Sequence, residues 1–300
     1  MLESGLDPAA RGLRGAAPKI AFLLEVKVTD FNFGVVPRRC STPSEAFSLL
    51  RSEGVAIVSG IGTAHEDARA LAQHVLDPLA PVVPDPAPIK EGGGNRDRSY
   101  VTSNLGETFA VPFQSGHTDG FAYGNAYPDF IFLLCVRPAA VGGASFAVDT
   151  YAILDRLVAS DRPDDAALAA FLQTVPIEQT EPGFVSSVGP AIGDNGRGRR
   201  MSRWTPVQRP IAGLSADEHA RQTAWLARWT ELAHQASLAA PRFMLHAGDA
   251  LCLDNYRLLH GRTGFDDTER SLWRIWAWTS EAPDVPGGLL FSDSRYAVTE

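Results

Sequence analysis

The stretch His246-Ala-Gly-Asp-Ala-Leu-Cys-Leu-Asp-Asn-Tyr-Arg-Leu-Leu-His-Gly-Arg262 holds the pattern that decides the fold. Two turn signals, Gly248-Asp249 and Asp254-Asn255, enclose a short apolar run. An apolar run of this length between turns is typical of a buried strand. A second apolar run leads from the Asp-Asn turn to His260. The stretch therefore predicts two short strands joined by a tight turn, with a histidine on the second strand.

Short strands of this kind recur along the chain. Apolar patterns between turn residues predict strands at residues 22–33, 55–58, 99–103, 130–136, 144–148, 200–207, 242–245, 250–254, around 259 and at 271–279. Capping residues predict helices after Thr42, Thr63, Asp149 and Ser215, and a further helix covers 164–172. The regular strand–helix alternation of a doubly wound sheet is absent. We therefore expect a mostly β fold with helical insertions (α+β), a β-sandwich or jelly roll decorated by helices.

Glycine and proline mark three irregular segments. Residues 1–18 are predicted to form a flexible N-terminal arm, and 81–95 a proline-rich loop without regular structure. Residues 182–204 carry many glycines and few apolar anchors, so we expect a mobile lid there. The remainder, residues 19–300, is predicted to be a single domain.

Composition excludes several classes of function. Lys and Arg number 27 against 35 Asp and Glu, and the net charge of −8 gives no general attraction to nucleic acid or to an anionic membrane. No apolar run approaches the roughly 20 residues of a membrane span, and no signal-peptide pattern is present. Three cysteines without a CxxC pair indicate neither a disulfide framework nor a structural zinc site. We expect a cytoplasmic protein whose partner is a small molecule.

His117-Thr118-Asp119 is the strongest chemical signal. In an extended segment residues i and i+2 share a face, so this imidazole and carboxylate can reach one cation. The motif alone is common by chance, but His260 adds a second imidazole from a distant segment. Two histidines and one carboxylate form the facial set that leaves three positions open on iron(II) for a chelating cosubstrate and oxygen. Neither a GxSxG elbow nor a glycine-rich phosphate loop is present.

Taken together, these motifs give a family resemblance. The motifs are His117-Thr118-Asp119, Val141-Gly-Gly-Ala-Ser145 and the pattern GD…DN…HGR…F…R…R that runs from Gly248 to Arg274. On them the chain resembles the iron(II)- and 2-oxoglutarate-dependent oxygenases of the taurine dioxygenase and clavaminate synthase group, over roughly residues 54–279. The resemblance implies a double-stranded β-helix core, in agreement with the jelly roll expected above.

The resemblance also implies roles for individual residues. His117, Asp119 and His260 match the metal ligands. Arg270, ten residues after His260, matches the arginine that binds the distal carboxylate of 2-oxoglutarate, helped by the Ser145 hydroxyl. Arg274 is then expected to face either the cosubstrate or an acidic group of the substrate, and this division between the two arginines stays open.

The implied chemistry is oxidation of a C–H bond with Fe(II), 2-oxoglutarate and O2. Relatives that halogenate replace the metal-binding carboxylate by a small residue, so Asp119 implies hydroxylation with release of succinate and CO2. Desaturation, cyclisation or epoxidation would use the same site and remain alternatives. A jelly-roll binding protein without redox chemistry is a more remote alternative, because it would not need Arg270 after an HxD…H set.

The substrate is expected to be a small amino acid or an amino-acid-derived natural-product intermediate. Four arginines in the lid segment suggest an anionic or zwitterionic molecule, and a solvated arginine run explains them equally well. These arginines are Arg197, Arg199, Arg200 and Arg203. Candidate substrate contacts are Gln114, Phe121, Tyr123, Arg203 and Arg274. His246 precedes the Gly-Asp turn, at the far end of its hairpin from His260, and is expected to be structural.

Overall fold

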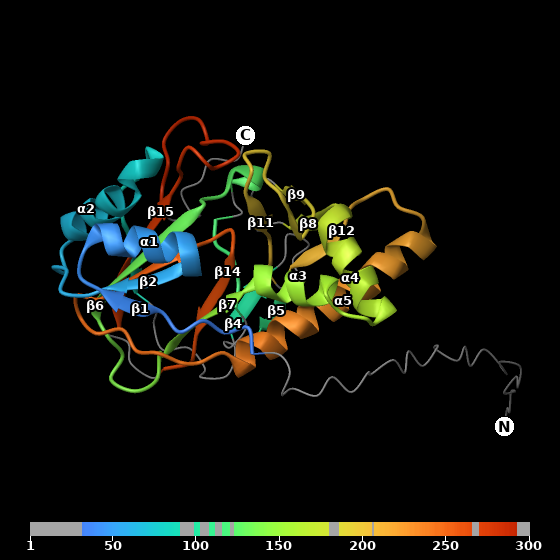
Figure 1. Cartoon of the computed structure of the whole chain (residues 1–300), viewed down its shortest axis with the longest axis horizontal. Helices are drawn as coiled ribbons and strands as arrows, with labels where there is room; N and C mark the ends of the chain where they lie inside the picture. Colours follow the sequence, from blue (N-terminus) through green and yellow to red (C-terminus); the bar gives the residue numbers. More distant parts are fainter. Residues whose placement is uncertain are drawn as a thin grey trace, which may run out of the picture.

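The computed structural model describes residues 32–90, 99–102, 108–111, 116–120, 123–179, 186–205, 207–265 and 270–292. The expected N-terminal arm, residues 1–18, lies outside them. Within these described ranges, strands are the commonest elements, and the five helices stand at the two sides of the strands (Figure 1). Among the described residues, no helix combines the length and the apolar character needed to cross a membrane.

A six-stranded sheet forms the larger β layer, in the order β1-β2-β13-β6-β15-β3. Its strands are β1 (Arg38–Cys40), β2 (Val55–Val58), β3 (Ala87–Lys90), β6 (Phe130–Arg137), β13 (Ala250–Asp254) and β15 (Ser271–Ala277). Only β1 and β2 pair in parallel, and every other pair in this sheet is antiparallel. Strands that are distant in sequence therefore lie side by side, with β13 between β2 and β6.

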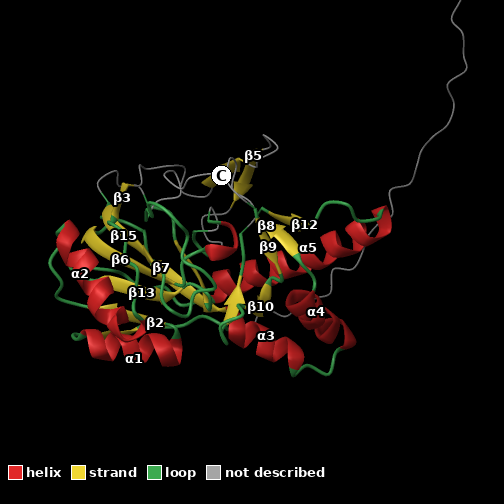
Figure 2. Ribbon diagram, turned by 90° about the horizontal axis from the view of Figure 1, so that it is seen from above, coloured by secondary structure: helices red, strands yellow, loops and turns green. Residues whose placement is uncertain are grey.

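The inner strands β2, β6, β13 and β15 have both faces largely buried, because alternate side chains enter different cores. On β13, Ala250 and Cys252 pack toward helices α1 (Pro43–Glu53) and α2 (His65–Leu76), which cover one face (Figure 2). Leu251 and Leu253 enter the core on the opposite face. On β15 the same alternation places Trp276 in this second core, and Arg274 shares its face.

A smaller sheet faces that second core. Its strands are β7 (Ser145–Asp149) and β14 (Leu258–Arg262), which pair antiparallel, and an isolated bridge from His117 to His260 extends it. Ala147 and Leu258 point toward the large sheet, whereas Phe146 and Leu259 point outward. The outward side chains pack against three helices, α3 (Thr150–Val158), α4 (Pro163–Thr174) and α5 (Ala216–Ala239). The space between the two sheets is where the candidate site lies.

The remaining elements are short. They are β4 (Ser99–Thr102), β5 (Thr108–Val111), β8 (Ile177–Gln179), β9 (Ser187–Gly189), β10 (Ile192–Asp194), β11 (Arg200–Ser202), β12 (Gln208–Pro210) and two 3-10 turns, η2 (Asp77–Leu79) and η3 (Gly124–Ala126).

Three predicted helix starts are confirmed by their caps. The side chains of Thr42, Asp149 and Ser215 each accept a hydrogen bond from a main-chain N–H in the first turn. The fourth prediction was wrong by one residue, because α2 is capped at Ala64. There the Asp67 carboxylate, in the first turn of the helix, accepts a hydrogen bond from the Ala64 N–H at 3.0 Å, so a helical residue provides the side-chain cap.

Other sequence predictions need correction. The described part of the predicted loop, residues 81–90, is not wholly irregular, because β3 pairs with β15 there, and residues 91–95 lie outside the described residues. Residues 242–245 form a single bridge through Phe243 rather than a strand, and the strand predicted over 200–207 ends at Ser202.

The described part of the expected lid, residues 186–204, is strand-rich. It contributes β9, β10 and β11, and Ile192, Met201 and Trp204 are buried. Its mobility stays a prediction.

Candidate active site

The HTD segment is held in place by main-chain hydrogen bonds on both sides. The His117 and His260 amides each donate to the other's carbonyl oxygen at 3.0 Å. The Thr118 N–H donates to the Trp204 carbonyl at 3.0 Å. The segment therefore acts as a short strand between β14 and Trp204, and His117 and Asp119 lie on one side of it, as the alternation predicts.

Asn255, at the turn after β13, fixes the main chain of Asp119. Its side-chain oxygen accepts from the Asp119 N–H at 3.0 Å, and its amide group donates to the carbonyls of Asp119 at 3.0 Å and Pro128 at 2.8 Å. The next residue, Gly120, has φ +86°, and a Cβ there would lie 2.2 Å from the Pro128 ring. The turn after Asp119 therefore requires glycine. The sequence showed Asn255 only as a turn residue, and its contact with Asp119 is new.

His117, Asp119 and His260 form a compact group. The Asp119 Oδ1 atom lies 3.2 Å from His117 Nε2 and 3.9 Å from His260 Nε2, and one ligand atom from each residue falls within 4.8 Å of the others. The side chains of Asp119 and His260 are about nine-tenths buried, whereas that of His117 is 42% exposed. Among the described residues, this is the one group of histidine, cysteine and carboxylate side chains close enough to hold a metal. Its donors, two imidazoles and one carboxylate, fit iron(II) with open positions.

The charges of the group also suit metal binding. Burial raises the pKa of Asp119, but the Arg274 guanidinium and the two histidines outweigh burial and hold this pKa well below its ordinary value. Burial, together with the charge of His117, lowers the pKa of His260 to about 4. At neutral pH the site therefore offers an ionised carboxylate and a neutral buried imidazole, the forms in which these groups bind metals.

The outer oxygen of Asp119 has partners of its own. Its Oδ2 atom accepts from Trp276 Nε1 at 3.0 Å and lies 3.3 Å from an Arg274 nitrogen. Arg274 also donates through Nε to the Ser292 carbonyl at 3.1 Å and lies over the Trp276 ring. Arg274 is thus next to the histidine–aspartate group. Trp276 was not among the residues predicted from the sequence, although its position two residues after Arg274 places both side chains on one face of β15.

Arg270 lies at the start of β15, beside the paired glycines. It is 6% exposed, and its guanidinium carbon lies 5.2 Å from the centre of the Phe265 ring. The neighbouring Gly143 has φ +71°, a conformation that favours glycine, and a Cβ there would only touch Arg270 Nε, at 3.5 Å. Ser145, two residues further along, begins β7 and is buried.

Of the candidate substrate contacts, Tyr123 and Arg203 are described, and Gln114 and Phe121 lie outside the described residues. The Tyr123 ring packs edge-on against Trp276, and its hydroxyl exchanges hydrogen bonds with the main chain of Phe291. Arg203 is 5% exposed and donates to the Ser187 hydroxyl and the Pro190 carbonyl. A contact of either residue with substrate stays a prediction.

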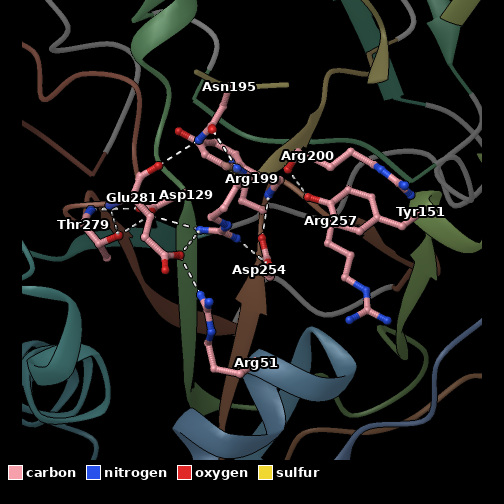
Figure 3. Close-up of polar contacts among 12 residues, drawn as sticks. Arg51, Asp129, Tyr151, Asn195, Arg199, Arg200, Asp254, Arg257, Thr279 and Glu281 are labelled. Atoms are coloured by element: carbon pink, nitrogen blue, oxygen red, sulfur yellow. Dashed lines mark hydrogen bonds and ion pairs between the residues drawn. The ribbon is translucent and has the colours of Figure 1, made fainter. Parts of the chain in front are cut away.

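The side chains of Arg199, Arg200 and Arg203 have partners within the chain. Figure 3 shows Arg199 between Asp129 and Asp254, at distances of 3.4 and 2.6 Å. Arg200 pairs with Asp155 at 2.8 Å. These ion pairs weaken the case that Arg199 and Arg200 bind an anionic substrate.

The expectation for His246 agrees with its position. Its side chain is exposed and lies outside the metal-binding group, and its N–H donates to the Asp249 carboxylate at 2.7 Å.

Comparison with known proteins places the chain in a family. The model of the family "Taurine catabolism dioxygenase TauD, TfdA family" matches residues 30–276. A uridine-5'-phosphate dioxygenase from Streptomyces sp. is 25% identical, with 81% of this chain and 92% of that protein covered.

Two solved structures share the fold at low identity. A taurine dioxygenase from Burkholderia xenovorans has TM-score 0.54 and 18% identity, with 79% and 82% of the two chains covered. PvcB from Pseudomonas aeruginosa has TM-score 0.51 and 17% identity, with 82% and 83% covered. PvcB is described as an Fe, alpha-ketoglutarate dependent oxygenase from an isonitrile synthetic pathway. The family match spans the HTD motif, His260 and both arginines, and the chain therefore belongs to the TauD/TfdA family of iron(II)- and 2-oxoglutarate-dependent oxygenases.

Proposed function

We propose that this oxygenase hydroxylates an unactivated C–H bond of a small amino acid or an amino-acid-derived intermediate, with His117, Asp119 and His260 as the iron ligands. The observation that carries the proposal is the Asp119 carboxylate itself, since it lies within 3.2 and 3.9 Å of the two histidines. A carboxylate at this position takes the place that a halide would need. Residues 19–300 then form one domain on a double-stranded β-helix, which the two facing sheets support.

In this proposal Arg270 and Arg274 bind different groups. Bound iron(II) and 2-oxoglutarate together supply oxygen activation, coupled to decarboxylation of 2-oxoglutarate to succinate. Arg270 is buried beside the glycine pair and holds the distal carboxylate, together with the Ser145 hydroxyl. Arg274 lies next to Asp119 and faces the carboxylate of the cosubstrate or of the substrate. The packed rings of Trp276 and Tyr123 keep water from this side of the site.

The substrate is anionic or zwitterionic in this proposal. Arg274 supports this, because it is a positive charge within 3.3 Å of Asp119 and most of its side chain is buried. A second candidate is a phosphorylated nucleoside, favoured by the 25% identity with a uridine-5'-phosphate dioxygenase across 92% of that protein.

The test has two stages. Iron(II) and 2-oxoglutarate are added without oxygen, and the visible charge-transfer band of the chelate is measured. His117→Ala is expected to abolish the band and Arg270→Ala to weaken it. An unchanged band in both variants overturns the site. Free amino acids, carrier-tethered aminoacyl groups and uridine-5'-phosphate are then screened for succinate release above background, and mass spectrometry of the product separates addition of oxygen from loss of hydrogen.

A further inference from the structure

The two oxygens of the Asp119 carboxylate have different surroundings. Oδ1 faces the two imidazoles, at 3.2 Å from His117 Nε2 and 3.9 Å from His260 Nε2. Oδ2 points the other way, toward the Trp276 indole N–H at 3.0 Å and the Arg274 guanidinium at 3.3 Å. One oxygen is thus available to a metal while the other is occupied by donors from β15.

We infer that Trp276 is a positioning residue that makes Asp119 a one-oxygen ligand of the iron. This inference rests on the metal site proposed above. A carboxylate that bound through both oxygens would take up an additional coordination position. Because the cosubstrate needs two open positions and oxygen a third, a facial set works only if each of its side chains supplies one atom. The hydrogen bond from Trp276 to Oδ2 keeps that oxygen from the metal, so that Asp119 supplies one ligand atom.

The indole is better suited than the guanidinium to fix the direction of the carboxylate. Trp276 is 2% exposed, its main-chain N–H donates to the Ser292 hydroxyl at 3.2 Å, and its ring packs edge-on against Tyr123. An indole has one N–H donor and few rotatable bonds, so this packing determines where the N–H points. Arg274 has several donors on a long flexible chain, and one of them is bonded to the Ser292 carbonyl.

This arrangement separates two tasks on β15. Arg274 can turn a guanidinium N–H toward a bound carboxylate, and Trp276 continues to hold Oδ2 when it does. Side chains that orient a metal ligand in this way typically change metal affinity by about 10- to 100-fold when they are lost.

The test compares Trp276→Phe with Trp278→Phe. Trp278 lies two residues further on, is also fully buried, packs on the same tyrosine and donates its indole N–H to the Ala126 carbonyl. Each variant removes one indole and one buried hydrogen bond, but only Trp276→Phe removes a donor from Asp119. Cobalt(II) is titrated into each protein without oxygen, and its affinity and its visible ligand-field spectrum are recorded.

We expect Trp276→Phe to bind cobalt(II) about 10-fold or more weakly and to show a changed spectrum, since Oδ2 then loses the indole donor and keeps only the more flexible Arg274 as a partner. Trp278→Phe should stay within about 3-fold of the unmodified protein, with the same spectrum. The inference is overturned if Trp276→Phe matches the unmodified protein, or if both variants weaken equally. If the unmodified protein and His117→Ala bind cobalt(II) alike, the metal site itself is wrong.

A second replacement covers the case in which Trp276→Phe does not fold. Benzothienylalanine at position 276 keeps the bicyclic shape and has sulfur where indole has N–H. It is expected to give the same loss of affinity and the same spectral change. A normal cobalt(II) affinity and spectrum with this residue in place would overturn the inference.

Discussion

His117 and His260 are joined through their main chains, each amide donating to the other's carbonyl at 3.0 Å. The positions of the two imidazoles are therefore set by strand pairing, before any metal binds. Because the bridge uses no side-chain atoms, the imidazoles can be removed without breaking it.

His117→Ala is therefore expected to abolish binding of iron(II) or cobalt(II) and to leave stability nearly unchanged. The side chain is 42% exposed, and replacement of partly exposed residues usually changes stability by less than about 1 kcal/mol. Calorimetric titration with cobalt(II) and urea unfolding measure the two effects. The control is His246→Ala, an exposed histidine outside the group, which should bind as the unmodified protein does. Equal binding by both variants contradicts the assignment.

Arg270→Ala should weaken 2-oxoglutarate binding, because a buried charge-assisted pair with the distal carboxylate is lost. A hydrogen bond to a charged group is worth about 1.5–3 kcal/mol. Its loss corresponds to a rise of roughly 10- to 150-fold in the 2-oxoglutarate concentration that gives half of the full band. The charge-transfer band, titrated with 2-oxoglutarate, measures this. Arg262→Ala is the matched control, since Arg262 also lies over the Phe265 ring. The same rise in both variants would show that Phe265 packing, not carboxylate binding, is affected.

Asn255→Ala should destabilise the fold and also weaken the metal site. It removes three hydrogen bonds of a fully buried side chain, two of them to Asp119, at a cost of about 2–4 kcal/mol. Asn195→Ala is the comparison, because Asn195 is also a buried turn residue, bonded to Glu281 and Arg199 rather than to the HTD motif. Urea unfolding should show losses in both variants, and cobalt(II) affinity a loss only in Asn255→Ala. Unchanged affinity there means that Asn255 does not position Asp119.

Asp129 gives a prediction for pH. Burial raises its pKa to about 7, although the Thr279 hydroxyl and Arg199 oppose the rise. The folded protein therefore keeps this proton between about pH 4 and 7, where the unfolded chain has lost it, and this contribution to stability is lost as the pH rises through that window. Asp129→Asn has no proton to lose. Its stability relative to the unmodified protein should increase between pH 5 and 8, by about 1–3 kcal/mol. Urea unfolding at both pH values measures the difference, and an equal difference at both contradicts the prediction.

The sequence predicted those features of the fold that depend on neighbouring residues. The caps at Thr42, Asp149 and Ser215 are local contacts within one turn, and they appear as expected. Strand β3 was missed because its partner, β15, lies far away in the chain and because Pro88 argues against a strand. As an edge strand, β3 tolerates that proline.

The site was predictable as a set of residue types but not as a set of contacts. The HTD motif and His260 stand out because few side chains bind iron. Trp276 did not stand out, since a tryptophan in an apolar strand looks like an ordinary core residue. The arginines of residues 197–203 suggested a basic lid, whereas the acidic partners of Arg199, which are Asp129 and Asp254, lie far from it in the sequence.

Residues near 292 have a consequence for how the protein is made. Ser292 bonds to both Arg274 and Trp276, and Phe291 bonds to Tyr123. A ribosome releases the HTD motif long before these residues, so the nascent chain holds two of its candidate ligands while the third, and the groups that orient the carboxylate, are still missing. A premature stop before residue 291 would leave a protein with all three candidate ligands and with Arg274 and Trp276, but without the Ser292 and Phe291 bonds that hold Arg274, Trp276 and Tyr123 in place.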